Sequence, residues 1–121
     1  MKRNPRKTLI NKNDKLWFQI LLKDYCEVCD APAKQVHHFF PKGSYGHLRY
    51  HLKNGISLCQ KCHLRHHLSG DPTIHQTIIE KRGLDWYNNL LLEARQKVAP
   101  IKIKDLEVIH SDLLDKLNEI C

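Results

Sequence analysis

Hydrophobic positions in the first half of the chain change from a helical to an extended spacing. Between about residues 14 and 24, they cover one face of a helix: Leu16, Trp17, Ile20 and Leu21. Shorter runs at residues 34–38 and 55–58 have the character of strands. The stretch at 41–46 between them is rich in turn residues, so we expect a hairpin with a long loop of the kind that often carries function. The helix should pack on the core that this hairpin builds.

Helical spacing returns after the second strand and is punctuated by glycine and proline. One helix should run from about residue 60 to 68 and stop at Gly70. Asp71 and Pro72 then offer an N-cap and a first-turn proline for the next helix, which Gly83 closes.

Two more helices are expected beyond this point. The first covers about residues 85–97, and Pro100 separates it from the second, which begins near Lys104. The last helix carries an apolar stripe at helical spacing: Leu106, Ile109, Leu113, Leu117 and Ile120. This stripe most simply packs on the core, with a dimer seam as the alternative. The pattern predicts an α+β fold, with a helix before the hairpin and about three C-terminal helices.

The chain length is that of one domain with a modest core, since it has 121 residues. Residues 1–15 form a basic arm, expected to be disordered in isolation, and its charged residues are Lys2, Arg3, Arg6, Lys7, Lys12 and Lys15 against Asp14. The arm is either a solubilising tail or a grip on a polyanion. The single domain should span 16–121, with its core at 26–70 and a helical extension at 71–121.

The net charge of the chain indicates which class of binding partner to expect. Twenty Lys and Arg residues against 13 Asp and Glu residues give a formal net charge of +7 at pH 7. An excess of this size points to a polyanion, nucleic acid first. No apolar stretch approaches membrane-spanning length, and residues 1–12 lack the apolar run of a secretion signal. We therefore expect a soluble, cytoplasmic protein without a membrane partner.

Four of the five cysteines form two CxxC pairs, Cys26 with Cys29 and Cys59 with Cys62. In an intracellular chain this spacing favours metal-binding thiolates over disulfides. The two pairs complete a tetrahedral four-cysteine set for a structural Zn²⁺, which would tie the start of the hairpin to the start of the following helix. Cys121 is left over and is expected to be a bystander thiol.

Histidines exceed what this zinc site can use. His63 and His67 are four residues apart on the predicted helix, so their rings share one face and can hold a common ion. His37 and His38 are neighbours on the first strand and point to opposite faces, so that one can bind the ion while the other faces water. Several other histidines are most simply surface residues: His47, His51, His75 and His110.

The order of these motifs resembles the HNH (ββα-metal) nucleases that carry a four-cysteine zinc site. A CxxC pair, a paired histidine, an asparagine and CxxCH with a further histidine follow one another as in that family. Residues 26–90 are moreover similar to the phage recombination endonucleases of the NinG or Rap type. This narrower resemblance rests on Gly43-Ser44-Tyr45-Gly46-His47-Leu48-Arg49-Tyr50, Asn54, His67-Leu68-Ser69-Gly70 and Ile78-Ile79-Glu80-Lys81-Arg82-Gly83.

The resemblance implies roles for individual residues. His38 would be the general base that deprotonates the attacking water, and His37 a ligand of the catalytic metal. Asn54 would brace the hairpin loop so that His38 keeps its orientation. His63 and His67 would complete the metal site from the helix.

Two departures from the family pattern affect this metal site. Many HNH enzymes have an aspartate where this chain has His37, and an all-imidazole ligand set suits Mn²⁺, Ni²⁺, Co²⁺ or Zn²⁺ better than Mg²⁺. Relative to the NinG pattern, the basic N-terminal region is shorter and extra residues follow Cys62. The helix ligand is therefore His67 or His66, with His67 favoured; His66 shares the helix face of Cys62 and better suits a supporting or phosphate contact.

The implied activity is hydrolysis of DNA phosphodiester bonds, with branched or recombination-intermediate DNA as substrate and a phage as source. Five cations near the site are candidates for phosphate contacts: Lys42, Arg49, Lys53, Lys61 and Arg65. Two other interpretations stay open, a non-catalytic zinc-stapled DNA-binding module and an adaptor that binds protein through its C-terminal helices. The adjacent pair His37-His38 discriminates between them and the nuclease, because a structural site needs one ligand there and no base.

Overall fold

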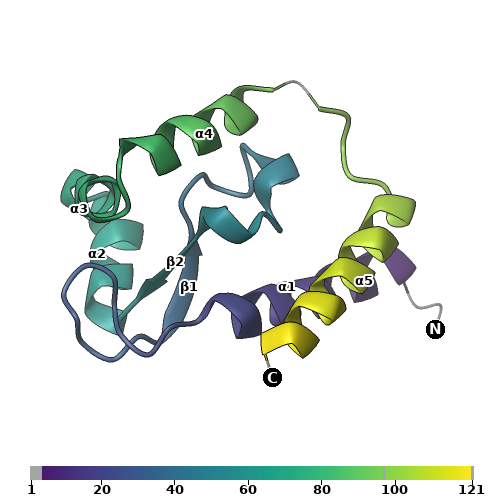
Figure 1. Cartoon of the computed structure of the whole chain (residues 1–121), viewed down its shortest axis with the longest axis horizontal. Coiled ribbons are helices and arrows are strands. Elements are labelled where there is room, and N and C mark those ends of the chain that lie inside the picture. Colours follow the sequence, from purple (N-terminus) through teal and green to yellow (C-terminus); the bar gives the residue numbers. More distant parts are fainter. Residues whose placement is uncertain (1–3, 97, 121) are drawn as a thin grey trace.

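The computed structural model describes residues 4–96 and 98–120, which form helices around a small sheet (Figure 1). The elements are α1 (Pro5–Leu21), β1 (Gln35–His38), η1 (Gly46–Leu48), η2 (Leu52–Asn54), β2 (Gly55–Leu58), α2 (Gln60–Ser69), α3 (Pro72–Arg82), α4 (Leu84–Arg95) and α5 (Ile103–Ile120). The first and last helices, α1 and α5, lie side by side, while α2, α3 and α4 lie on the other side of the hairpin. The predicted mixture of helices with a two-stranded sheet is confirmed at this level.

The sheet is an antiparallel pair in which His37 lies opposite Ile56 and His38 opposite Gly55. Strand β2 is buried along its whole length, because α1 covers it on one side and the α2–α4 helices on the other. Gly55 marks the point where α1 crosses the strand. A Cβ atom there would lie 2.5 Å from Leu21 Cδ1 and 2.9 Å from Trp17 Cζ2, so only glycine permits this approach.

The predicted helix boundaries after β2 are close to those observed. Gly70 ends α2 in the left-handed conformation, with φ of 58°. The Asp71 side chain caps α3 by accepting the N–H of Thr73, and Pro72 is its first residue. Ile74 and Ile78 are fully buried, as their spacing predicted. Local sequence signals were sufficient here.

The basic arm is the main correction to the predicted elements. Helix α1 begins at Pro5 rather than near residue 14, with Asn4 as its N-cap accepting the N–H of Lys7. The arm that was expected to be disordered in isolation is therefore helical from residue 5 onward in the folded chain. The reason is a tertiary partner: α5 packs along α1, and the buried Asn13 side chain donates to the Leu106 carbonyl at 3.1 Å. Residues 1–3 and 97 and Cys121 lie outside the described residues.

Apolar side chains gather in two clusters, one on each side of the sheet. The larger joins β2 with α3 and α4, and among its members are Ile56, Leu58, Ile74, Ile78 and Leu90. The smaller joins α1 with α5 and is built around Trp17, Tyr50, Leu106 and Leu113. The core position expected for Trp17 is confirmed, since the residue is only 3% exposed. Both clusters pack against the hairpin, one on each face of the sheet, and this packing sets the directions of His37 and His38.

The apolar stripe of α5 is buried over only part of its length. Leu106 and Leu113 are buried against α1, whereas Ile120 at the end of the helix is exposed. Packing within the chain therefore accounts for the middle of the stripe without a second copy. Among the described residues, no helix is long and apolar enough to cross a membrane.

Candidate functional site

The four paired cysteines meet beside the hairpin. Their sulfur atoms all lie within 4.8 Å of one another, and Cys29 Sγ is 3.5 Å from Cys59 Sγ. Sulfurs that share one tetrahedral zinc ion at bond lengths of about 2.3 Å lie about 3.8 Å apart. The four cysteines thus fit a structural metal ion of the zinc type, as the spacing predicted.

Backbone geometry around the sulfurs also fits bound thiolates. The N–H of Val28 points at Cys26 Sγ and that of Cys62 at Cys59 Sγ, both at 3.4 Å. Burial raises the pKa of Cys59, but the Cys62 N–H and the neighbouring thiols outweigh burial and lower this pKa to about 7. Cys59 therefore loses its proton more readily than an ordinary thiol. It is also the N-cap of α2, where the helix dipole favours negative charge.

Glu27, between the first two cysteines, ties the cysteine cluster to the rest of the molecule. One of its oxygens accepts the N–H of Ser57 at 2.7 Å, and both accept from the guanidinium of Arg82 at 2.8 Å. Burial raises the pKa of Glu27, yet the hydrogen bonds from Arg82 and Ser57 bring it below its ordinary value. Sequence analysis missed this residue because its partner lies in α3, and nothing local indicates the pair.

Imidazole rings form a second cluster between β1 and α2. Ring centres lie 5.6 Å apart for His37 and His63, 5.9 Å for His37 and His67, and 5.2 Å for His63 and His67. Three imidazoles bound tetrahedrally to one ion, at metal–nitrogen distances of about 2.0–2.1 Å, have ring centres about 5 Å apart. The ring centres of the predicted trio are thus close to this separation, which does not by itself place their nitrogen atoms around a common point. Within the described residues, however, only the cysteines already bring their ligand atoms within 4.8 Å of one another.

His66 and His75 extend this cluster away from the trio. The ring of His66 meets the edge of His37 at 4.4 Å, and His75, from α3, lies 4.8 Å from His66. His75 also stacks on Phe39 at 4.2 Å. Nδ1 of His66 and Nε2 of His75 are buried without a hydrogen-bond partner in the described structure. His66 thus lies beside His37 in the imidazole cluster, and its expected role as a supporting residue stays a prediction.

The charge state of His37 follows from this crowding. Burial, followed by repulsion from the imidazoles of His66 and His63, lowers the pKa of His37 to about 3. Burial likewise lowers the pKa of His63, with His67 contributing. These rings are neutral at physiological pH, and a neutral imidazole is the form that binds a metal ion.

His38 points away from this cluster, as strand alternation requires. Its ring stacks on the indole of Trp17 with centres 4.2 Å apart and planes 6° apart. Its Nε2 lies 2.9 Å from the carbonyl oxygen of Arg49. Because a carbonyl can only accept, Nε2 must carry the hydrogen, and Nδ1 keeps the lone pair. His38 is half-buried rather than freely open to water, and burial is the main reason that its pKa is lowered, against the opposing Arg49 carbonyl.

Asn54 closes the hairpin loop from inside. It is fully buried, its amide donates to the carbonyls of Phe40 and Leu48, and its carbonyl accepts the N–H of Phe40 at 2.8 Å. The Phe39 N–H in turn donates to the Asn54 backbone carbonyl. These contacts fix the chain directly after His38 and the start of the loop that carries Arg49.

The five candidate phosphate contacts fall into two groups. Arg49 is held by Asp14 through two hydrogen bonds of 3.0 and 2.8 Å, and Arg65 is similarly paired with Asp71. The other three candidates have exposed side chains without an ion pair in the described structure: Lys42, Lys53 and Lys61. The two arginines therefore have structural partners that sequence analysis did not foresee.

The four histidines expected at the surface are all partly buried and engaged, so that expectation is wrong. His47 contacts the Glu93 carbonyl, and Nε2 of His51 lies at hydrogen-bond distance, 2.7 Å, from a carboxylate oxygen of Glu93. His110 bonds to the buried Asn13 side chain, and His75 joins the imidazole cluster. The partners of His47, His51 and His110 come from elements distant in sequence, and that of His75 comes from the preceding helix, so all four contacts depend on how the helices pack.

Comparisons of the chain with protein-family models, with curated proteins and with solved structures find no match. Function must therefore be argued from the chemistry of the two clusters.

Proposed function

We propose that this protein is a metal-dependent endonuclease of the HNH type that hydrolyses DNA phosphodiester bonds. The single observation that supports this best is the divergence of His37 and His38. One ring enters a cluster of imidazoles, with its centre 5.6 Å from that of His63 and 5.9 Å from that of His67, and its neighbour offers an unshared lone pair on the opposite side of the strand. A structural metal site needs the first ring only.

The two clusters would divide the work. The four cysteines hold a structural Zn²⁺ and so fix the hairpin against α2. His37, His63 and His67 hold a second divalent ion, for which an all-imidazole set favours Mn²⁺, Ni²⁺, Co²⁺ or Zn²⁺ over Mg²⁺. When bound, such an ion supplies positive charge to a non-bridging phosphate oxygen and to the departing 3′ oxygen.

His38 acts as the general base in this mechanism. Nδ1 takes a proton from a water molecule, whose oxygen bonds to phosphorus in line as the bond to the 3′ oxygen breaks. The departing oxygen takes a proton from solvent, which leaves a 5′ phosphate and a 3′ hydroxyl. The Arg49 carbonyl holds the Nε2 hydrogen, fixes the tautomer and stabilises the imidazolium that forms.

Two neighbours keep this base in position. Trp17 stacks on one face of the ring and limits its rotation. Asn54 fixes the loop between His38 and Arg49, so that the carbonyl acceptor stays at hydrogen-bond distance. The proposed substrate, branched or recombination-intermediate DNA, follows from the NinG-type resemblance, whereas the net charge of +7 supports DNA in general.

A non-catalytic DNA-binding module is the second candidate. The observation in its favour is that the described residues gather metal-ligand atoms closely at the cysteines alone. In that case the imidazoles would pack on one another without supporting turnover, and the basic surface would account for the function.

Cleavage assays separate the two candidates. Wild type, His38→Ala and a matched control, His110→Ala on α5, are compared on linear, nicked, flapped and four-way DNA with Mn²⁺ or Mg²⁺. The nuclease proposal expects cleavage by wild type and control and a strong loss in His38→Ala. Equal cleavage by wild type and His38→Ala, or no cleavage by a wild type that has bound both metals, would overturn it.

A further inference from the structure

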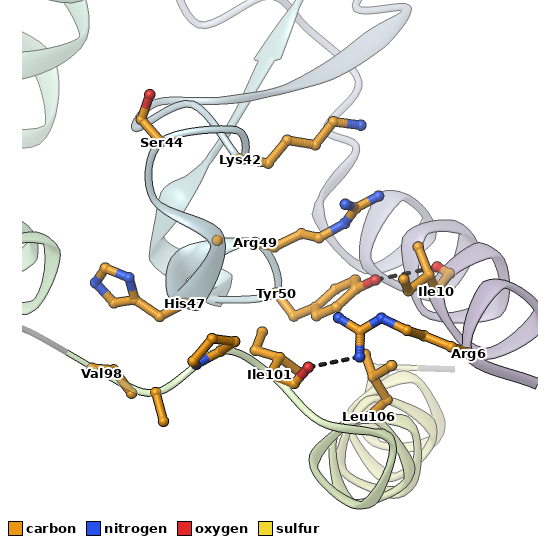
Figure 2. A pocket seen from close by; sticks show the side chains of 13 residues that line it. Arg6, Ile10, Lys42, Ser44, His47, Arg49, Tyr50, Val98, Ile101 and Leu106 are labelled. Atoms are coloured by element: carbon orange, nitrogen blue, oxygen red, sulfur yellow. Dashed lines mark hydrogen bonds between the residues drawn. The ribbon is translucent and has the colours of Figure 1, made fainter.

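A pocket of about 350 Å³ opens beside Arg49, the residue whose carbonyl contacts His38, at the junction of segments far apart in sequence. Helix α1 supplies Arg6 and Ile10, the hairpin loop supplies residues from 42 to 50, and the linker before α5 supplies residues 98–101. Figure 2 shows the side chains of Lys42, Arg49 and Arg6 around this space, with the Tyr50 ring between the two arginines.

The pocket is strongly cationic. Arg6, Lys42 and Arg49 line it, and no acidic side chain does so among the described residues. Asp14 neutralises Arg49 from outside the lining, which leaves two positive charges in excess. The Arg6 guanidinium donates to the Ile101 carbonyl at 2.7 Å, and this bond uses one of its five N–H groups. The lining therefore has donors to spare for an anion.

The pocket adjoins the proposed general base. Arg49 provides both a pocket side chain and the carbonyl that contacts His38. A strand that passes His38 would thus have a neighbouring phosphate within reach of the cations of the pocket.

We propose that this pocket is a subsite for a backbone phosphate of the DNA strand next to the cleaved bond. The inference rests on the proposed function, adds Arg6 as a binding residue and assigns Lys42 to the same phosphate. A phosphodiester suits this pocket because it is an anion, and the lining offers cationic hydrogen-bond donors without a carboxylate that would repel it. Guanidinium groups also match the geometry of phosphate oxygens. The arm expected either to be a tail or to grip a polyanion would then contribute through Arg6, from an ordered helix.

Two glycines in the loop offer a steric test that leaves charge unchanged. Gly46 lines the pocket and Gly43 does not, and a Cβ at either position meets nothing within 4 Å. Gly46→Leu should partly fill the pocket, and Gly43→Leu is its matched control. Binding of a fluorescein-labelled duplex and single strand is measured by anisotropy on the zinc-loaded full chain, without added Mn²⁺ or Mg²⁺. We expect about tenfold weaker binding for Gly46→Leu, the equivalent of one charge-assisted hydrogen bond. Equal affinities for the two variants would overturn the subsite.

Charge removal gives an independent test. Lys42→Gln and Arg6→Gln are compared with Lys12→Gln, an exposed cation of α1 that does not line the pocket. Each pocket variant should lower the slope of log affinity against log salt by about one, the signature of one lost phosphate contact. Lys42→Gln removes no hydrogen bond of the described structure, so its melting temperature should stay that of wild type. Slopes equal to that of Lys12→Gln would contradict the proposal.

These outcomes separate the subsite from the nuclease itself. Pocket-dependent binding without cleavage in Mn²⁺ would support the subsite and refute the catalytic mechanism. Cleavage by wild type with unchanged binding in Gly46→Leu and Lys42→Gln would refute the subsite and leave the mechanism standing.

Discussion

The cysteine and histidine clusters draw on the same short unit of structure, yet they differ in how closely their ligand atoms converge and in how many of their polar atoms have partners. Both take residues from α2 and from the chain around β1. In the cysteine cluster the sulfurs converge, receive backbone N–H groups and are anchored through Glu27. In the histidine cluster the rings crowd together, and two buried nitrogens lack partners in the described structure. A closed, satisfied site is suited to holding a fold, and an incompletely satisfied one to binding and chemistry.

One helix can serve both clusters because of its angular spacing. Cys62 and His63 are adjacent in sequence but about 100° apart around α2. The sulfur therefore joins the zinc-type site while the imidazole faces His37. In β1 the alternation of the strand does the same for His37 and His38. The comparison implies that substitutions of the clustered cysteines should affect folding, and substitutions of the histidines should affect the proposed cleavage activity.

The largest effect is expected from Cys59→Ser. Structural zinc contributes on the order of 10 kcal/mol to the folding of small zinc domains, so loss of one thiolate should release the ion and leave the domain unfolded at room temperature. Circular dichroism and zinc content measured on the same sample check this. Cys121→Ser, the cysteine outside the CxxC pairs, is the control and should keep both signals. A folded, zinc-free Cys59→Ser protein would contradict the assignment of the cysteines as the structural element.

His38→Ala should have the opposite profile. Loss of a general base lowers the cleavage rate by about 10²- to 10⁴-fold, whereas the zinc content should not change. Its melting temperature should fall, because the ring packs on Trp17, but only slightly, because the ring is half-buried rather than part of the core. The measurement is the single-turnover cleavage rate beside a thermal melt. A loss of stability as large as that of Cys59→Ser would remove the distinction between the two clusters.

The sequence was informative where a local signal decides the structure. Gly70, Asp71 and Pro72 fixed the boundary between α2 and α3 because caps act within one turn. The CxxC spacing was sufficient for the cysteine cluster, since each pair places two sulfurs through a tight local turn.

The signals that failed are those that depend on distant partners. The first turns of α1 are polar and basic, and they are helical because α5 packs on them. His75 joins the imidazole cluster only because α3 turns back over α2, and the Glu27–Arg82 pair depends on the same packing. The direction of the His37 and His38 side chains was predictable from strand alternation, but the Arg49 carbonyl that fixes the His38 tautomer was not.

Glu27→Gln tests whether the cysteine cluster depends on its anchor. The substitution keeps the shape of the side chain but removes the charge that faces the nearly buried Arg82 guanidinium. The expected loss is about 2 kcal/mol in the free energy of unfolding, the range for a buried hydrogen bond to a charged group. Urea denaturation at neutral pH measures it, with Glu80→Gln on the exposed face of α3 as control. Equal stability of the two variants would show that the anchor is dispensable.

The smallest effect separates His66 from His67 within the histidine cluster. If His67 binds the ion, His67→Ala should lower Mn²⁺ affinity much more than His66→Ala, which removes only the ring that backs His37. Loss of such a supporting contact typically weakens metal binding by about 10- to 100-fold, and the lower end is expected because His66 makes an edge contact with His37 rather than a hydrogen bond. Isothermal titration with Mn²⁺ on zinc-loaded protein measures both variants. A larger loss in His66→Ala would exchange the two roles, since the 4.4 Å contact with His37 would then belong to two ligands of one ion.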